Sequence, residues 1–279
     1  MSNVIISQFL TNNSIIHTID NDSLIIPNNN IIIEFVELST HREQHLKDKR
    51  YHLNKTNLAI SKGYTLIHVF ENEWKDKQEI VKSRLLNQLG KSKFKYFARK
   101  CVVKQIQAAE ARKFISETHI QGYVASKLNY GLFHNDELLA CMTFGKPRYN
   151  KSVDWEVLRY SSKLYSSIVG GASKIFSHFL KQQSPKRVVS YADKRWSKGN
   201  MYRQLQFKEL KDSNVSYFYF KLNDLSLRMF HRSHFQKHKL QKLLTTFDYN
   251  LTEYQNMLAD GYDRIWDCGN KVFIWSNEE

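Results

Sequence analysis

The feature that most constrains the fold is a run of β-branched and aromatic residues, IIIEFV, at positions 31–36. Such a run is typical of a buried β-strand, and buried strands normally exclude ionised side chains. Glu34 nevertheless lies inside the run, and His41 follows it seven positions later. The carboxylate has two interpretations: it faces water from an edge strand, or the strand holds it as a ligand of Mg²⁺.

The distribution of charge restricts the class of partner. The chain has 279 residues and a formal net charge of +15. The first 40 residues contain no Lys or Arg, so the remaining 239 carry all 42 cationic residues against 23 acids. Such an excess favours polyanions, because Lys and Arg replace the counterions of phosphates. We therefore expect double-stranded DNA as a partner, and a protein that is merely basic and soluble is the alternative.

No segment indicates a membrane or secreted protein. No window comes near the run of about 18 apolar residues that a membrane span needs, and the start MSNVIISQFL lacks the basic flank and long apolar run of a signal peptide. Cys101, Cys141 and Cys268 are far apart and lack the spacing of a metal site. We expect reduced thiols, a cytoplasmic location and no contact with a membrane.

Apolar patterns and turn residues predict an α/β (α+β) chain with several segments. Residues 1–90 form the first domain, with short strands at SIIHTID, SLIIP, NIIIEFVEL and YTLIHVF. A polar stretch with spaced leucines predicts a helix from Arg42 to Lys62, which ends at Gly63, and a second helix ends at Gly90. Residues 91–100, KSKFKYFARK, form a basic connector.

Two further segments follow the connector. Residues 101–222 predict a second domain with two strands joined at Asn135-Asp136, then the strands DWEVLRYSS, RVVSYAD and VSYFYFK, and a helix after SSIVGG. Residues 223–279 predict a basic module, with a helix over LSLRMFHRSHFQKHKLQKLL and an acidic helix around Tyr254.

The stretches SLIIPNNNIIIEF and RYHLNKTNLAISKGYTLIHVFENEWKDKQEIVKSRL resemble the nuclease domain of phage homing endonucleases, relatives of very-short-patch-repair endonucleases. The resemblance implies a restriction-endonuclease-like fold for residues 1–90 and Mg²⁺-dependent hydrolysis of DNA in a bacterial host cell. It makes Glu34 a metal ligand and His41 the general acid or base. Ser23 occupies the position of the family's first aspartate, and the adjacent Asp22 is the candidate for the second metal ligand.

The segments SSIVGGASKIFSHFLK and SYADKRWSKGNMYRQLQF resemble the N-acyltransferase (GNAT) fold, closest to Mom-type phage enzymes that modify DNA adenine. In that fold a glycine-containing loop at a helix N-terminus holds the pyrophosphate of acyl-CoA, and a later helix carries a tyrosine. The cofactor-binding residues that the resemblance implies are Gly170, Gly171, Ala172, Ser173, Asn200 and Tyr202. Asp193, Arg195 and Tyr202 are the candidates for acyl chemistry. The loop lacks the family's leading basic residue, so a domain that keeps the fold and only binds DNA is the alternative.

Cationic residues crowd the helix expected at the start of the basic module. Leu225, Met229 and Leu240 give it an apolar side that can dock on a core, which leaves the cationic side for phosphates. The residues expected to contact nucleic acid are Arg195, Arg228, Arg232, Lys237, Lys239 and Lys242. A solvated charged face is the alternative.

Three functions are compatible with these patterns. The leading hypothesis is a homing-endonuclease-like enzyme with Mg²⁺ at Glu34 and Asp22. The second is a GNAT-like, acyl-CoA-dependent transferase that modifies DNA. The third is a DNA-binding protein without catalysis, because Ser23 and residues 36–40 depart from the nuclease pattern. The sequence indicates no oligomeric state.

Overall fold

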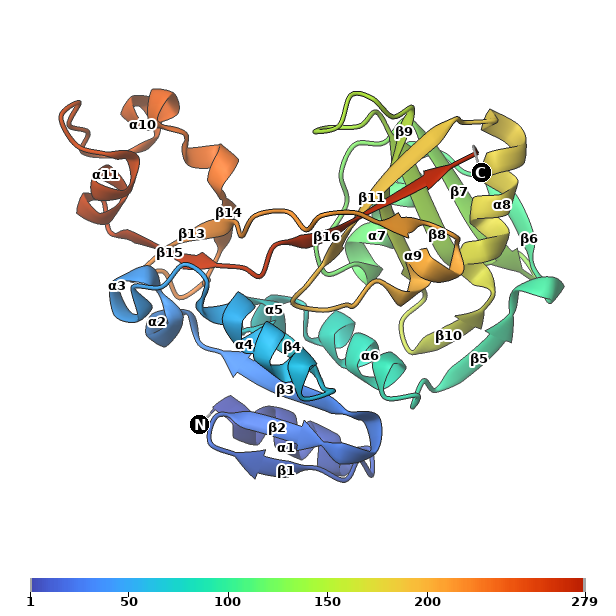
Figure 1. The fold of residues 1–279 in the computed structure, drawn as a ribbon, viewed down its shortest axis with the longest axis horizontal. Coiled ribbons are helices and arrows are strands. Elements are labelled where there is room, and N and C mark those ends of the chain that lie inside the picture. Colours follow the sequence, from blue (N-terminus) through green and yellow to red (C-terminus); the bar gives the residue numbers. More distant parts are fainter. Residues whose placement is uncertain (1, 278–279) are drawn as a thin grey trace. The chain divides into compact units, whose positions relative to one another are not determined.

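The computed structural model describes residues 2–277, and the chain forms two compact units, each assembled from separate stretches of sequence (Figure 1). Unit 1 comprises residues 1–76, 193–198 and 213–270, and unit 2 comprises residues 77–192, 199–212 and 271–279. Across the described part of the chain, no helix has the length and apolar character needed to cross a bilayer.

A four-stranded sheet in the order β1–β2–β3–β4 forms the centre of unit 1. Its strands are Thr18–Asp20, Ser23–Ile26, Ile31–Val36 and Thr65–Phe70, which confirms the strands predicted there. The first three are antiparallel, and β4 lies parallel to β3. Five of the six residues of β3 are buried, as is typical of a strand covered on both faces.

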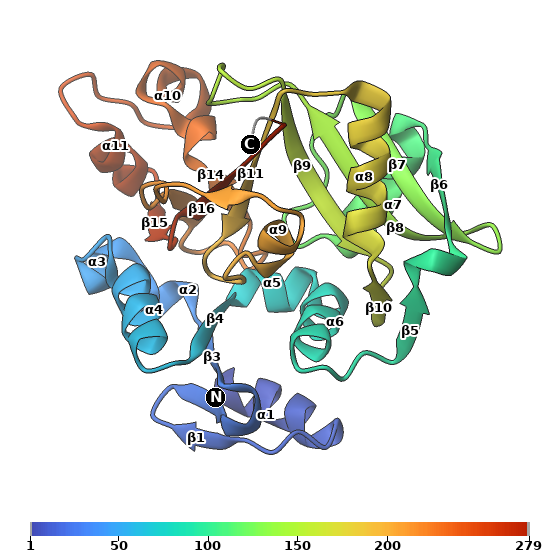
Figure 2. The same ribbon diagram turned by 45° about the vertical axis from the view of Figure 1, so that its right-hand side comes forward.

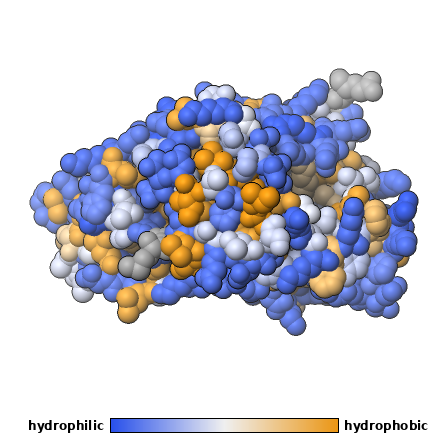
Figure 3. Space-filling model, turned by 90° about the horizontal axis from the view of Figure 1, so that it is seen from below, coloured by the Kyte–Doolittle hydropathy of each residue, from blue (hydrophilic) through white to orange (hydrophobic). Residues whose placement is uncertain are grey.

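The first helix, α1 (Ser2–Asn12), was not predicted from the sequence. Ile6 and Leu10 lie one turn apart and are fully buried, and the helix packs against β2 and β3. Val4 and Ile5 stay exposed on the same helix, as does Ile19 on β1. These exposed apolar residues obscure the 3.6-residue period. Figure 3, which views the molecule from below, shows apolar residues among a mainly hydrophilic surface.

The single helix expected from Arg42 to Lys62 is interrupted. The helices that follow β3 are α2 (Leu38–His41), α3 (Glu43–Leu46) and α4 (Tyr51–Ser61). Lys47 adopts φ +55° and ends α3, and the Asp48 carboxylate then accepts a hydrogen bond of 2.8 Å from the backbone N–H of Arg50. Aspartate side chains favour turns by binding nearby backbone in this way. After β4 comes α5 (Glu71–Asp76).

The prediction of one continuous basic helix from Leu225 to Leu244 is also wrong. Its residues form strand β14 (Met229–His231), a 3₁₀ turn η3 (Arg232–Phe235) and the short helix α10 (Lys237–Leu243). β14 pairs with β13 (Tyr217–Lys221), which also pairs with β15 (Tyr262–Trp266) in a small antiparallel sheet. Helix α11 (Glu253–Ala259) begins at a Thr252 capping box.

Unit 2 contains a seven-stranded sheet in the order β12–β16–β11–β9–β8–β7–β6. These strands are Lys208–Glu209, Asn270–Ser276, Arg187–Asp193, Trp155–Ser162, Glu137–Gly145, Leu128–His134 and Val102–Gln105. Asn135 and Asp136 join β7 to β8 with φ of 48° and 60°, which confirms the predicted turn. Positive φ at both positions is the geometry of a two-residue hairpin that Asn and Asp tolerate.

Helices cover both faces of this sheet. The helices of unit 2 are α6 (Gln78–Gln88), α7 (Ala108–Thr118), α8 (Gly171–Gln183) and α9 (Asn200–Gln204). Cys141 of β8 packs with Ile115 of α7, whereas the adjacent Met142 packs in the cluster of Phe179 on α8. Because neighbouring strand residues face opposite sides, α7 and α8 lie on opposite faces. Figure 2 shows α8 running along β7, β8 and β9.

The basic connector contributes a strand of its own. Within residues 91–100, β5 (Phe94–Phe97) runs parallel to β10 (Ser166–Val169), the strand that leads into α8. Lys95 is the register partner of Ser167. A Cβ placed on Gly170 would lie 3.6 Å from the Cβ of Ala98, so the connector touches the glycine turn. The segment that the sequence presented as a link is therefore part of the unit 2 structure.

Candidate functional site

A buried cluster of polar side chains surrounds Glu34 in unit 1. Glu34 on β3 and His68 on β4 are register partners, and Oε2 of Glu34 lies 2.9 Å from Nδ1 of His68. The Lys55 ammonium, from α4, pairs with the other carboxylate oxygen. Nε2 of His41 is 3.9 Å from that same oxygen. Glu34 is 1% exposed and His68 is fully buried, so this strand carries its acid as an internal ion pair.

The neighbours of Glu34 fix its charge. Burial opposes ionisation, yet His68 and Lys55 lower the pKa of Glu34 to about 2. Burial also opposes a charged His68, but Cys268 and Glu34 raise the pKa of His68 to about 9. Opposite charges at this range favour the ionised forms. At neutral pH the cluster therefore contains a carboxylate between two cations.

Two further residues complete the environment of His68. The Thr56 hydroxyl lies 2.8 Å from Nε2 of His68 and 3.4 Å from Sγ of Cys268. His52 places Nδ1 at 2.8 Å from the carbonyl oxygen of Trp266 and packs edge-on against His68. Burial, chiefly, holds the pKa of His52 well below its ordinary value. The sequence analysis assigned no site role to His52, Thr56, His68 or Cys268, although the first three lie in the stretch that resembles the nuclease domain.

The predicted metal ligands do not form a Mg²⁺ site. Ser23 is the register partner of Glu34, but Asp22 lies in the exposed turn before it. Both oxygens of Glu34 already face cationic partners, which would repel a further cation. Within residues 2–277 no group of three or more His, Cys, Asp or Glu has an arrangement suited to a metal ion. The donor set around Glu34 therefore does not fit Mg²⁺.

Arg195 was expected to contact nucleic acid and to be a candidate for acyl chemistry, but it is 4% exposed. Its guanidinium lies 2.9 Å from Glu73 and 3.0 Å from Asp193, and it covers the ring of Phe70 at 4.1 Å. Asp193 thus serves as one of its two carboxylate partners. These contacts hold Arg195 inside unit 1, away from a nucleic-acid surface.

The glycine turn of unit 2 places four of the predicted cofactor residues together. Gly170 has φ +76°, a conformation that favours glycine, and Gly171 begins α8. A Cβ on Gly171 would lie 2.9 Å from Cγ2 of Ile168 and 3.0 Å from the Tyr160 hydroxyl. Ala172 and Ser173 continue the first turn of the helix. The close packing explains why the chain has glycine at position 171.

The strands β9 and β11 of the same unit separate partway along their length. They are parallel and pair only at three registers, the last of which is Val157 with Ser190, although both strands continue. The Ser190 hydroxyl lies 3.0 Å from the Val157 carbonyl oxygen and 2.8 Å from the Tyr202 hydroxyl. Tyr202 of α9 is thus tied to the point where the strands part. Asn200 begins the same helix but is exposed, and its side chain accepts a bond of 3.0 Å from Arg203.

A buried carboxylate lies one residue before the parting point. Glu156 of β9 is fully buried and accepts two guanidinium bonds and one backbone N–H bond from Arg148, at 2.7 to 3.1 Å. Arg159 donates to the carbonyl oxygens of Gly122 and Leu158. Burial and the nearby Arg148 lower the pKa of Arg159 to about 10. Glu156 was not predicted as a site residue, since its only signal was an acid between apolar residues in DWEVLRYSS.

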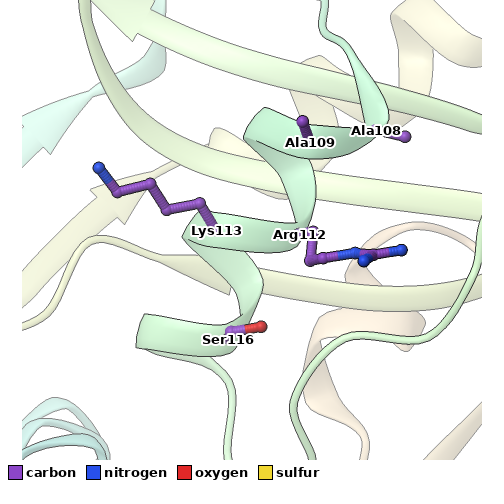
Figure 4. Close-up of a pocket in the computed structure, with 5 residues that line it drawn as sticks. All are labelled: Ala108, Ala109, Arg112, Lys113 and Ser116. Carbon is purple, nitrogen blue, oxygen red and sulfur yellow. The ribbon is translucent and has the colours of Figure 1, made fainter.

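Two of the hollows on the described surface involve charged residues. One, of about 440 Å³, lies along α7 and is lined by Ala108, Ala109, Arg112, Lys113 and Ser116. The side chains of Arg112 and Lys113 point away from each other (Figure 4). The other, of about 760 Å³, lies in unit 1 and contains three of the residues predicted to contact nucleic acid, Arg228, Lys239 and Lys242. Arg232 and Lys237 do not line it.

Comparisons with known proteins give a distant likeness. No protein-family model and no curated protein matches the chain. Similar solved structures include a GNAT family acetyltransferase from Elizabethkingia anophelis with acetyl-CoA bound (11% identity, TM-score 0.33), an acetyltransferase from Bacillus subtilis in complex with CoA (10%, 0.34) and IAA acetyltransferase from Bacillus cereus (9%, 0.32). Each match covers 63% of this chain and 97 to 99% of the other.

These findings correct the leading hypothesis from the sequence. A Mg²⁺-dependent DNA endonuclease is wrong, because the residues around Glu34 do not fit the metal on which that reaction depends. The chain is a mixed α/β protein, and neither a restriction-endonuclease-like domain nor a phage origin has support.

Proposed function

We propose that unit 2 is an acyltransferase that takes its acyl group from acyl-CoA. The observation that carries the proposal is the position of the Tyr202 phenol, bonded to Ser190 where β9 and β11 part. Beyond this point the facing strand edges no longer pair with each other. Such edges suit an extended, amide-containing chain like the pantetheine arm of CoA, which can add main-chain hydrogen bonds.

The phosphates of the cofactor would lie at the glycine turn. Backbone N–H groups and the helix dipole make the start of a long helix favourable for phosphate. The loop itself has no basic residue, but the adjacent connector brings cations from another part of the sequence. Lys95, Arg99 and Lys100 are exposed on either side of Ala98, which touches Gly170. Together, the turn and the connector provide the charge that the loop lacks.

Acyl transfer to an amine requires two proton movements. The amine nitrogen attacks the thioester carbonyl, a C–N bond forms, the C–S bond breaks, the nitrogen loses a proton and the CoA sulfur gains one. Burial raises the pKa of Tyr202, so its phenol is protonated. The phenol can therefore donate a proton to the CoA sulfur.

Ser190 can stabilise Tyr202 through this step. Its hydroxyl has one hydrogen and two oxygens within reach, the Val157 carbonyl and the Tyr202 phenol. The Ser190 hydroxyl can donate its hydrogen to the carbonyl or to the phenol oxygen, which leaves the phenol hydrogen to face the sulfur. When Tyr202 gives up its proton, the Ser190 hydrogen can turn to the phenolate. Glu156 remains bound by Arg148, which assigns it to positioning β9.

Cofactor binding is the first test of this proposal. Isothermal titration of the full chain with CoA should give saturable binding, weakened by about tenfold or more in the double variant Lys95→Ala/Arg99→Ala because two phosphate contacts are lost. Lys181→Ala, at the far end of α8, is the matched control and should bind as the unaltered chain does. No heat of binding at millimolar CoA would refute the proposal. DNA, the acceptor that the sequence predicted, is tested as a substrate by following thiol release with adenine-containing oligonucleotides and with simple polyamines.

A further inference from the structure

The groove of unit 1 is formed by β14, η3 and α10. Its lining residues are Arg228, Met229, Phe230, His231, Ser233, His234, His238, Lys239, Lys242 and Leu243. Six of these ten are Arg, Lys or His, and none is Asp or Glu. The sequence had placed most of these cations along one helix, whereas the strand, the turn and the short helix bring them around a hollow.

The cations of the groove differ from other cations of the same unit. Lys55, Arg195 and Arg264 each pair with a carboxylate. Among the described residues, by contrast, no acid pairs with Arg228 or Lys242, and both side chains are exposed. These two cations create a positive potential that an anionic ligand would neutralise.

Aromatic groups supply a second kind of contact. The rings of Phe230 and His234 are stacked, with centroids 5.3 Å apart and 24° between their planes. The Arg228 guanidinium lies over the Phe230 ring at 4.9 Å. The Lys239 ammonium donates to the Ser233 carbonyl oxygen at 2.9 Å, which fixes η3 against α10. Planar groups beside unpaired cations suit a ligand that combines phosphates with flat bases.

We propose that this groove binds nucleic acid, with Arg228 and Lys242 on the phosphodiester backbone and His234 beside a base. The inference is independent of acyl transfer, since it concerns unit 1 alone. The backbone phosphates are common to duplex and single strands. The stacked ring pair distinguishes the two, because only unpaired bases expose their faces to an aromatic side chain.

Fluorescence anisotropy of the full chain with labelled 20-nucleotide single strands and the matching duplex tests the proposal. We expect saturable binding at low salt that weakens steadily as salt is added. Arg228→Ala/Lys242→Ala should weaken binding by about tenfold or more and reduce the slope of log affinity against log salt by about 2. The matched control, Lys49→Ala/Lys62→Ala, removes two exposed lysines of the same unit outside the groove and should bind as the unaltered chain does.

Each outcome has a definite meaning. His234→Ala should reduce single-strand affinity more than duplex affinity, and an equal loss for both would overturn the base-stacking part. The proposal fails if the groove variant binds both ligands like the unaltered chain, or if the unaltered chain binds neither. It also fails if heparin of matched charge competes as well as the oligonucleotide does, because the surface would then recognise charge alone. Circular dichroism of each variant confirms that it is folded.

Discussion

Nδ1 of His68 lies 2.9 Å from Oε2 of Glu34, and the two residues are direct partners across the parallel strands β3 and β4. This relationship answers how the run IIIEFV accommodates an acid. The carboxylate neither faces water nor holds a metal, because His68 and Lys55 neutralise it inside unit 1. A buried pair of this kind is stable only as long as both partners are present.

Removing the charge of Glu34 is expected to destabilise the protein. Glu34→Gln leaves the fully buried His68 without its counter-charge, and breaking one partner of a buried pair costs about 3–5 kcal/mol. The free energy of unfolding in urea at neutral pH measures the effect. Asp22→Asn, in the exposed turn of the same sheet, is the control and should change stability by less than about 0.5 kcal/mol. Similar stabilities of the two variants would mean that the ion pair contributes little.

The same pair predicts how stability depends on pH. The pKa of His68 rises from 6.5 to about 9 on folding, so its contribution is full below pH 6.5 and is lost as the pH rises through about 9. The pKa of Glu34 falls from 4.5 to about 2, so its contribution is present above pH 4.5 and is lost as the pH falls through about 2. Urea unfolding from pH 6.5 to about 9 should show a decline that His68→Asn removes. An equal decline in the variant would assign it to other groups.

The sequence predicted strands better than it predicted helices. The runs around Ile31 and Thr65 are dense in β-branched residues, so their strands were evident. The helix over residues 42–62 was predicted as one piece because its leucines keep a helical spacing, although the Asp48 turn interrupts it. The helix over residues 225–244 failed for a tertiary reason, since β14 exists only by pairing with β13.

The residues of the candidate sites could likewise be predicted from the sequence only where the signal is local. The turn at Gly170 and Gly171 was predicted from the sequence because a tight turn before a helix has a local signal, and its role in cofactor binding stays a prediction. His68, on the other hand, meets Glu34 only through the register of two strands. The connector at residues 91–100 meets Gly170 only through the pairing of β5 with β10. Contacts between residues so distant in the chain have no signature in a single sequence.

The role proposed for Tyr202 gives a kinetic prediction. Tyr202→Phe keeps the ring but removes the proton donor, so the turnover of acyl-CoA should fall by about 10²-fold while the Kd for CoA stays within about twofold. Ser190→Ala should lower kcat less, and it should shift the alkaline side of the pH profile because the phenolate loses its donor. Thiol release and isothermal titration separate the two effects. Tyr191→Phe, on the same strand as Ser190, is the control. Unchanged turnover in Tyr202→Phe would exclude the phenol as the acid.

Two glycines of unit 2 with similar backbones give a last prediction, on stability. Gly90 has φ +69° and open space where a Cβ would lie, whereas Gly199 has φ +83° and its Cβ would lie 2.2 Å from Cζ of Phe273. Gly90→Ala should therefore cost only the left-handed conformation, about 1 kcal/mol. Gly199→Ala adds overpacking of about 1–3 kcal/mol. It also displaces Phe273, which stacks on Tyr202 at 5.1 Å, so thiol release should fall in this variant alone. Urea unfolding compares the two variants, and equal losses of stability would show that the Phe273 ring yields without cost.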